Sequence, residues 1–349
     1  MTRALDLQRA ARYASKISMR AASNEVRWAT TSELRDSVPV EWSEARRFWA
    51  ANRFWMETQN LASKRYGGKR KQHWHAMELM ITVLEQALRV TGQYEVGRTH
   101  ADDLRLRHID LAFPHLPAAF DGFTLLHLSD LHLDGSPGLE ERILALIEGQ
   151  TFDLCVLTGD YRAAVHGPHD RAMRSLERLV GGLDVREGVL AVLGNHDDIH
   201  MVRPIEAMGV RLLVNERFAL DRDGQRLQFV GTDDVHYYYT DQATVALQAA
   251  SEAFTIALIH SPELCDAAAA AGVSLYLCGH THAGQVCLPR GIPLVKHLRT
   301  GRAYYRGCWR HHGMMGVTNS GAGTSGIPVR FNSRGEVLVL HLRREAAAE

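Results

Sequence analysis

Five groups of polar residues carry side chains that could bind metal ions, and each group follows a short apolar run. These groups are Ser129–His132, Thr158–Asp160, Gly194–Asp197, His260 and Gly279–His282. Seven of their side chains are metal-ligand candidates: Asp130, His132, Asp160, Asn195, His260, His280 and His282. Imidazole nitrogens with carboxylate and amide oxygens, and no sulfur, suit manganese, iron or zinc better than magnesium or calcium. We therefore expect divalent metal ions as cofactors, with manganese favoured.

Seven ligands are too many for one ion, so the set predicts two ions with one carboxylate between them. Two ions about 3.5–4 Å apart can hold a hydroxide and clamp both oxygens of an in-line displacement at phosphorus. In extended chain, residues i and i+2 point to the same side, so Asp130 and His132 could present two ligands together, as could His280 and His282. A single Asp-x-His or His-x-His pair is weak evidence for a metal site. The five polar groups in order, each after an apolar run, are much more specific evidence. The expected reaction is hydrolysis at phosphorus.

Short apolar runs alternate with helical patterns from about residue 95 onward. The expected strands are 123–128, 153–157, 189–193, 211–214, 227–230, 255–259, 275–278 and 337–342, and the expected helices include 139–149 and 170–180. Strands that alternate with helices indicate an α/β fold with a central sheet. Ligands in such sheets collect at the carboxyl ends of strands, so all five polar groups could face one crevice. Gly159, Gly194 and Gly279 precede ligand candidates, where a missing side chain lets the backbone turn tightly.

The chain has 349 residues, which favours two domains over one. We expect a helical extension over 1–94 and a catalytic domain over 95–349. Apolar residues at three–four spacing over 77–88 predict one helix of the extension, with Gly92 as its stop. The extension holds five of the six tryptophans: Trp28, Trp42, Trp49, Trp55 and Trp74. Two interpretations remain open: its aromatic side chains pack on each other or on the catalytic domain, or they form a surface that docks on anionic lipid.

Charge is balanced overall but unevenly distributed. Residues 1–100 contain 17 Lys or Arg and 10 Asp or Glu, and the remaining 249 contain 23 and 30, so the two parts carry +7 and −7. The acidic catalytic part argues against duplex nucleic acid as a partner, because phosphate backbones need a basic track. Five cysteines without a C-x-x-C pair suit a reducing compartment. We expect a cytoplasmic protein that could be peripheral on the inner face of the membrane.

The motif series resembles that of the calcineurin-like metallophosphoesterases over about residues 105–345. The motifs that carry the resemblance are Asp130-x-His132, Gly159-Asp160, Gly194-Asn195-His196-Asp197, His260 and Gly279-His280-Thr281-His282. The resemblance implies an α/β two-sheet sandwich flanked by helices, with a dinuclear metal centre at its edge.

The resemblance also implies roles for individual residues. Asp130, His132 and His282 would bind one metal, and Asn195, His260 and His280 the other, with Asp160 bridging. His196 would stabilise or protonate the leaving oxygen. Many family members continue the second motif as Gly-Asp-x-x-Asp, whereas here Arg162 and Ala163 follow Tyr161. Arg162 is a candidate for contacting a substrate phosphate, or else a surface loop residue.

A bacterial branch of the family shares finer motifs with this chain: Gly231–Asp234, Gly279–Gln285 and Gly323–Phe331. That branch includes membrane-face phosphodiesterases and a UDP-2,3-diacylglucosamine pyrophosphatase of lipid A synthesis. The favoured substrate is therefore a lipid- or nucleotide-linked diphosphate. The alternatives are a broad phosphodiesterase and a non-catalytic adaptor with the same fold. We expect Gly321–Gly326 to make a tight turn beside the site, and Asp233, Asp234 and His236 either to shape the substrate pocket or only to end a strand.

Overall fold

The computed structural model describes residues 41–66, 68–248 and 253–345. Trp28 and the first 40 residues of the expected extension lie outside the described residues. Three helices precede the first strand: α3 (Glu44–Tyr66), α4 (Gly68–Val90) and α5 (Gln93–Asp102). Gly92 follows α4 with a φ of 70°, the left-handed conformation that commonly terminates a helix. The predicted stop is therefore confirmed.

The chain divides into two compact units between Met56 and Glu57, within α3. In the first unit, the Trp42 and Trp49 rings lie 6.4 Å apart and Trp49 is buried, whereas Phe48 and Trp55 are exposed. Aromatic side chains of α3 are thus both packed and solvent-facing. The predicted domain boundary at residues 94–95 falls inside α5 and stays a prediction.

The second unit contains two six-stranded sheets. The first sheet has the order β1-β14-β2-β3-β4-β5 and the second β12-β13-β9-β8-β7-β6. The strands of the first are β1 (Arg105–Phe113), β2 (Thr124–Leu128), β3 (Leu154–Leu157), β4 (Val189–Ala191), β5 (Arg211–Leu212) and β14 (Glu336–Arg344). Those of the second are β6 (Glu216–Arg222), β7 (Gln225–Gly231), β8 (Phe254–Leu258), β9 (Leu275–Cys278), β12 (Gly307–His311) and β13 (Met314–Thr318).

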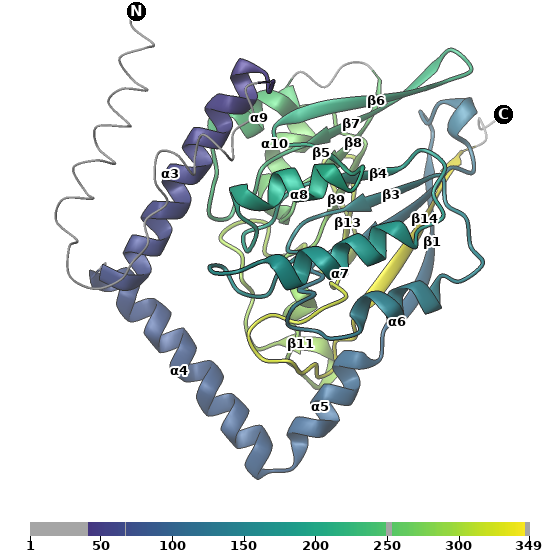
Figure 1. Ribbon diagram of the computed structural model, residues 1–349. Coiled ribbons are helices and arrows are strands. Elements are labelled where there is room, and N and C mark those ends of the chain that lie inside the picture. The colour runs from purple at the N-terminus through teal and green to yellow at the C-terminus, as the bar shows by residue number, and fades with distance from the viewer. Residues whose placement is uncertain (1–40, 67, 249–252, 346–349) are drawn as a thin grey trace, which may run out of the picture. The chain divides into compact units, whose positions relative to one another are not determined.

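Helices cover the outer faces of both sheets. Figure 1 shows α6 (Leu139–Leu146), α7 (Asp170–Gly181) and α8 (Val202–Ala207) against the first sheet. Apolar side chains of α9 (Asp241–Gln248) and α10 (Cys265–Ala270) pack on the second sheet. The predicted α/β two-sheet sandwich flanked by helices is therefore confirmed.

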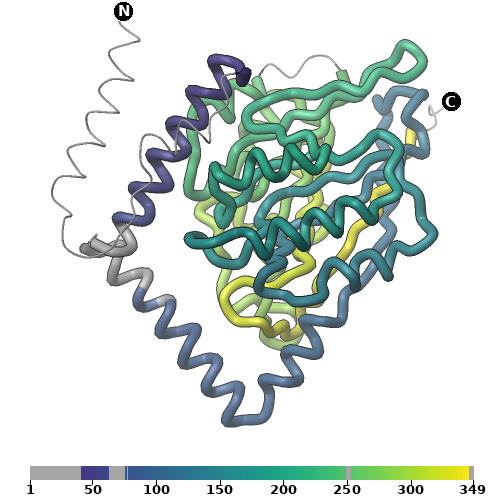
Figure 2. Tube along the Cα trace, in the orientation of Figure 1, coloured from purple at the N-terminus to yellow at the C-terminus, as the bar shows by residue number. Residues whose placement is uncertain are grey.

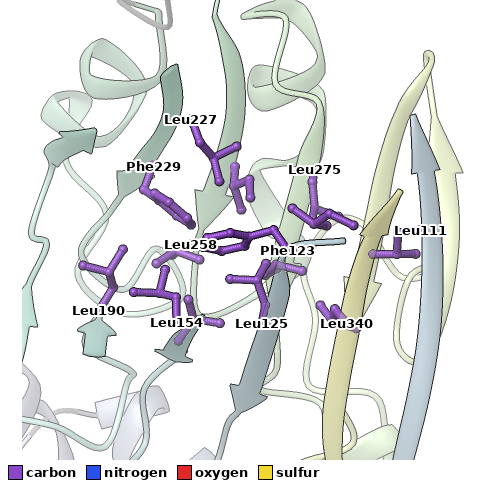
Figure 3. Close-up of a cluster of buried hydrophobic side chains, with 14 of the residues drawn as sticks. Leu111, Phe123, Leu125, Leu154, Leu190, Leu227, Phe229, Leu258, Leu275 and Leu340 are labelled. Carbon is purple, nitrogen blue, oxygen red and sulfur yellow. The ribbon is translucent and has the colours of Figure 1, made fainter. Parts of the chain in front are cut away.

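The core lies between the two sheets. Leu125, Leu154 and Leu340 of the first sheet meet Phe229 and Leu275 of the second, and all five are buried (Figure 3). Burying one such side chain stabilises the fold by about 1.5–3 kcal/mol. This layer fixes the two sheets face to face, and with them the strand ends that carry the polar groups.

The predicted strands all form, and six strands that were not predicted form as well: β1, β6, β10, β11, β12 and β13. The residues of β1 are mostly exposed, and this strand pairs in parallel with β14 from the far end of the chain (Figure 2). The strands β10 (Cys287–Leu288) and β11 (Ile292–Pro293) form a small hairpin. Partly exposed strands lack the continuous apolar run that revealed the buried ones.

Among the described residues, no helix combines the length and the apolar character needed to cross a bilayer.

Candidate metal centre

The seven predicted ligands come together at one edge of the sandwich. Asp130, Asp160 and Asn195 follow β2, β3 and β4 of the first sheet, and His260 and His280 follow β8 and β9 of the second. The strands β2, β3 and β4 are parallel neighbours, as are β8 and β9. Parallel strands deliver their carboxyl ends to the same edge, so each sheet presents its polar residues there. The expectation that strand ends would gather these side chains is confirmed.

One group of ligand candidates contains Asp130, His132 and His282, and all three are buried. Nε2 of His132 lies 3.1 Å from Nε2 of His282, which in turn lies 3.4 Å from Oδ1 of Asp130. Nδ1 of His132 lies 2.8 Å from the carbonyl of Arg162, so it carries the proton and leaves Nε2 with a lone pair in the neutral ring. Two ring nitrogens and a carboxylate oxygen thus face one point.

A second group contains Asn195, His260 and His280. Nε2 of His260 lies 3.1 Å from Oδ1 of Asn195 and 3.2 Å from Nδ1 of His280. The other nitrogen of each ring lies within 2.8 Å of a backbone carbonyl, that of Thr158 for His260 and that of His297 for His280. Both neutral rings therefore turn lone pairs toward the same point as the amide oxygen. Such a convergence of acceptors could hold a cation, and the bonded carbonyls fix the ring orientations.

Asp160 lies between the two groups. Its Oδ2 is 3.7 Å from Nε2 of His132 and 3.4 Å from Nε2 of His260. It is the one side chain that belongs both to the cluster with His132 and to the cluster with His260 and His280. A carboxylate in this place could bridge two ions.

Backbone strain is concentrated at this edge. Five ligand candidates have a positive φ between 42° and 70°: Asp130, His132, Asp160, His280 and His282. A non-glycine residue in this region costs roughly 1–3 kcal/mol and persists only where surrounding structure imposes it. The extended geometry predicted for Asp130-x-His132 and His280-x-His282 is therefore wrong, although both pairs do face the site.

The three glycines of the motifs have two different functions. Gly159 has a φ of 92°, which confirms the predicted turn there. Gly194 and Gly279 do not have a positive φ, although the chain turns directly after each, with Asp197 N donating to the Gly194 carbonyl and Thr281 N to the Gly279 carbonyl. A Cβ on Gly194 would instead overlap Asp160, and one on Gly279 would overlap Ser129 and Asp130. These two glycines allow ligand loops from different strands to approach each other closely.

Asp197 holds the ligand loops in place. Its carboxylate accepts the backbone amides of Asp160, Tyr161 and Gly194 at 2.7–2.9 Å. Asp197 belongs to the Gly194–Asp197 motif, but its residue type alone did not predict this role. Asp130 is held in a similar way, because its carboxylate accepts the Ser129 hydroxyl at 2.6 Å and the backbone amide of His280.

His196 lies beside the first group. Its ring packs edge-on against that of His132, and its Nε2 lies 3.9 Å from Oδ2 of Asp160. Nδ1 is 2.6 Å from the carbonyl of Ala163, so the proton on Nδ1 orients the ring. Because the side chain is 15% exposed, solvent reaches it. It is placed to meet a group that enters the site from outside.

The Arg162 side chain is buried, in contrast to the surface-loop interpretation. It donates hydrogen bonds to the carbonyls of His196, Val165 and Gly167 and pairs with Asp198 at 2.9 Å. These contacts tie the loop that follows β3 and holds Asp160 to the loop that holds His196. The contact between Arg162 and a substrate phosphate stays a prediction, and it would require the guanidinium to leave these partners.

Burial and charge shift the pKa values of these groups in opposite directions. Burial lowers the pKa of His132 to about 3 and raises that of Asp130 to about 6. Burial opposes ionisation of Asp160, but the imidazoles of His260 and His196 outweigh it and hold its pKa well below the usual range. Burial also opposes a charge on His260, yet Asp160 beside it raises its pKa well above the usual range. The pocket therefore favours positive charge near Asp160.

Further residues border the site. The His236 ring lies 4.5 Å from that of His280, and its Nδ1 is 2.8 Å from Oε2 of Glu263. His236 thus lies against a ligand candidate, which favours the pocket interpretation over a strand end alone. Glu263 was missed, because nothing in its sequence context distinguishes it from a surface carboxylate. The turn expected over Gly321–Gly326 does lie beside the site, with Gly323 N donating to the carbonyl of Asp130.

Comparison with known proteins agrees with this site. The family model of the calcineurin-like phosphoesterases matches residues 123–284. The chain is similar to the metallophosphoesterases YkoQ and YkuE of Bacillus subtilis (strain 168), at 29% and 28% identity. These alignments cover 61% and 65% of this chain and 81% and 82% of the relatives. It is also 26% identical to the phosphodiesterase YaeI of Escherichia coli (strain K12), over 48% of this chain and 63% of that protein.

The matched segment spans every ligand candidate, from Asp130 to His282, and ends within the loop that holds the last of them. The arrangement of buried imidazoles around shared carboxylates suits the divalent metals of this family. Residues 123–284 therefore carry a calcineurin-like phosphoesterase domain, and this match and the similarity to metallophosphoesterases support a metal-dependent phosphoester hydrolase.

Proposed function

We propose that this chain hydrolyses a phosphodiester or pyrophosphate bond with two divalent metal ions. The position of Asp160 carries this proposal, because its Oδ2 lies within 3.7 Å of a ring nitrogen of each ligand group. Asp130, His132 and His282 would hold one ion, Asn195, His260 and His280 the other, and Asp160 both. Two such ions would supply the charge that activates water and stabilises the transition state at phosphorus.

The protein's own side chains would position the substrate and move a proton. His196 keeps its Nδ1 proton on the Ala163 carbonyl, so Nε2 is the atom that exchanges a proton with the leaving oxygen. Asp197 and Asp130 keep the ligand loops in their strained conformations through hydrogen bonds to backbone amides. The donor set contains no sulfur, which supports manganese, with iron or zinc as the alternatives.

The proposed substrate is a lipid- or nucleotide-linked diphosphate, such as UDP-2,3-diacylglucosamine, or a simpler phosphodiester. The similarity to a phosphodiesterase supports the bond type. The exposed Phe48 and Trp55 side chains support our further proposal that the N-terminal region contacts a membrane surface. Vesicle binding by the full chain that is unchanged in a Phe48→Ser/Trp55→Ser variant would rule out this contact.

The test is metal-dependent hydrolysis by the full chain. Metal-free protein would be loaded with manganese, iron(II), zinc or magnesium and assayed on bis(p-nitrophenyl) phosphate, p-nitrophenyl phosphate and UDP-2,3-diacylglucosamine. We expect turnover of the diester or the UDP-sugar, and a loss of at least 10³-fold, about 4 kcal/mol, in Asp160→Asn and His196→Asn. His115→Asn, an exposed histidine remote in sequence from the motifs, is the matched control. Preference for the simple diester would identify a broader phosphodiesterase, and hydrolysis of none of these compounds in any metal would contradict the proposal.

A further inference from the structure

An exposed apolar cluster lies on the small hairpin that follows the last ligand loop. Leu288 of β10 and Ile292 of β11 are direct cross-strand partners and are 50% and 55% exposed. Leu294 and Val295, just beyond the hairpin, are also exposed. From residue 95 onward, the described residues include three other exposed large hydrophobic side chains: Val96, Tyr239 and Val245. Single exposed side chains need no explanation, but four within eight residues form a patch that indicates a binding surface.

The chain around this patch is strongly basic. Residues 267–335 contain eight Lys or Arg and no Asp or Glu, a net charge of +8. Residues 101–349 carry −7, so the rest of that part carries −7 − 8 = −15. Within the basic stretch, Arg290, Arg302 and Arg306 are exposed, and Nζ of Lys296 lies 4.1 Å from the centre of the Tyr305 ring. The Arg306 guanidinium lies close to Gly291, in the turn of the hairpin. Arg290 and Arg306 therefore place positive charge at the turn that joins Leu288 and Ile292.

The hairpin is joined directly to the metal centre. Pro293 of β11 packs so closely on Gly284 that a Cβ there would overlap it, and Gly284 is two residues after His282. The carbonyl of His297, four residues beyond β11, accepts the Nε2 proton of His280 at 2.8 Å. A surface that held the hairpin would therefore lie beside the ligand loops.

We propose that this hairpin surface, defined as Leu288, Arg290, Ile292, Leu294, Val295 and Arg306, docks the catalytic domain on an anionic lipid bilayer. The apolar side chains would enter the boundary between head groups and acyl chains, while the arginines contact lipid phosphates. The hairpin carries exposed apolar side chains and exposed cations, and the surrounding sequence contains no acidic residue. This combination matches the chemistry of that boundary. Docking here would hold the metal centre close to phosphates at the bilayer surface. The surface as defined contains no residue of α3.

The test is binding of the full chain to vesicles, measured by flotation. Vesicles of phosphatidylcholine with 30% phosphatidylglycerol would be compared with pure phosphatidylcholine at low and high salt. We expect binding to the anionic vesicles that weakens with salt, and at least a tenfold lower partition coefficient for Leu288→Ser/Ile292→Ser and for Arg290→Gln/Arg306→Gln. Val245→Ser and Arg174→Gln, exposed residues on α9 and α7, are the matched controls and should bind like the wild type. Thermal melts and turnover of the soluble diester should be unchanged in all four variants.

Three results would overturn the proposal: unchanged vesicle binding in both hairpin variants, equal wild-type binding to neutral and anionic vesicles, or loss of binding only in Phe48→Ser/Trp55→Ser. Self-association of the wild type that disappears in Leu288→Ser/Ile292→Ser, without lipid binding, would identify the patch as an interface between copies and overturn it as well. Vesicle binding is measured without substrate, so its outcome is separate from that of the proposed hydrolysis.

Discussion

The carboxylate of Asp197 accepts the backbone amide of Asp160 at 2.8 Å, so one buried acid holds another at the point where the two ligand groups meet. The same carboxylate holds Gly194 and Tyr161, and therefore loops that follow two neighbouring strands. Burial raises the pKa of Asp197 to about 6. The conformation of Asp160 thus depends on a residue that is not itself a ligand candidate.

Replacing Asp197 should disrupt the site without removing a ligand. Asp197→Asn keeps the size of the side chain but places an amide NH2 against backbone N–H groups that need acceptors. We expect metal affinity to fall by about 10–100-fold and the free energy of unfolding to fall by about 2 kcal/mol. Calorimetric metal titration and denaturant unfolding would measure the two effects. Asp223→Asn, at an exposed turn between β6 and β7, should change neither quantity; wild-type metal affinity in Asp197→Asn would refute this role.

The two ligand groups should lose metal separately. His132→Gln removes a ring nitrogen from the first group, and His260→Gln removes one from the second. We expect metal content to fall from two ions per chain to about one in each variant and to less than one in the double variant. Elemental analysis of protein dialysed against equal metal concentrations would measure this, with His115→Asn as the control. Loss of both ions in each single variant would show that the groups bind cooperatively and not as two independent sites.

Stability should depend on pH through His127, a buried residue of β2 that is not a ligand candidate. Its Nε2 contacts the Thr158 hydroxyl, and burial lowers its pKa from 6.5 to about 3. Below pH 6.5 the His127 side chain binds a proton in the unfolded chain but stays neutral in the folded protein. This histidine therefore destabilises the fold progressively as the pH falls from 6.5 toward 3. Between pH 7.5 and pH 5.0 its contribution is about 2 kcal/mol.

The His127 effect can be isolated by difference. The pKa values of other buried histidines, such as His132, are shifted too, so the comparison is between wild type and His127→Gln, both in chelator. The wild type should lose about 2 kcal/mol more than the variant between the two pH values, measured by urea unfolding. Parallel losses in the two proteins would mean that His127 is protonated at its ordinary pKa in the folded state.

A methyl group at Gly279 should displace a ligand. The Cβ of Gly279→Ala would overlap Ser129 Oγ and Asp130 Oδ2, which are short and buried side chains. We expect a loss of about 1–3 kcal/mol of stability, together with weaker metal binding and activity. Gly181→Ala is the matched control, because nothing lies within 4 Å of its new Cβ and its φ is not positive. If Gly279→Ala retained wild-type metal affinity, the close approach of the two loops would not be essential.

The sequence by itself determined the buried strands and the ligand candidates. Strands such as Leu275–Cys278 are continuous apolar runs, and each is followed at once by polar residues, so both signals are local. The function class followed from the same stretches, because the residue types and their order suffice to indicate two metal ions. The strand β1 has no such local signal, because it is partly exposed and pairs with residues 231 positions later, as Arg105 does with Glu336.

Only the tertiary structure decided how the ligand loops are shaped and what holds them. The left-handed backbone of Asp130 and His280 occurs where the loops that follow β2 and β9 meet, with His280 N donating to the Asp130 carboxylate, and these loops come from distant parts of the chain. The burial of Arg162 and the task of Asp197 likewise depend on loops that meet in space. Local sequence patterns indicate which residues of a strand or helix are buried. Backbone strain and hydrogen-bond partners depend on pairs of segments that are far apart in the sequence and meet only in the folded chain.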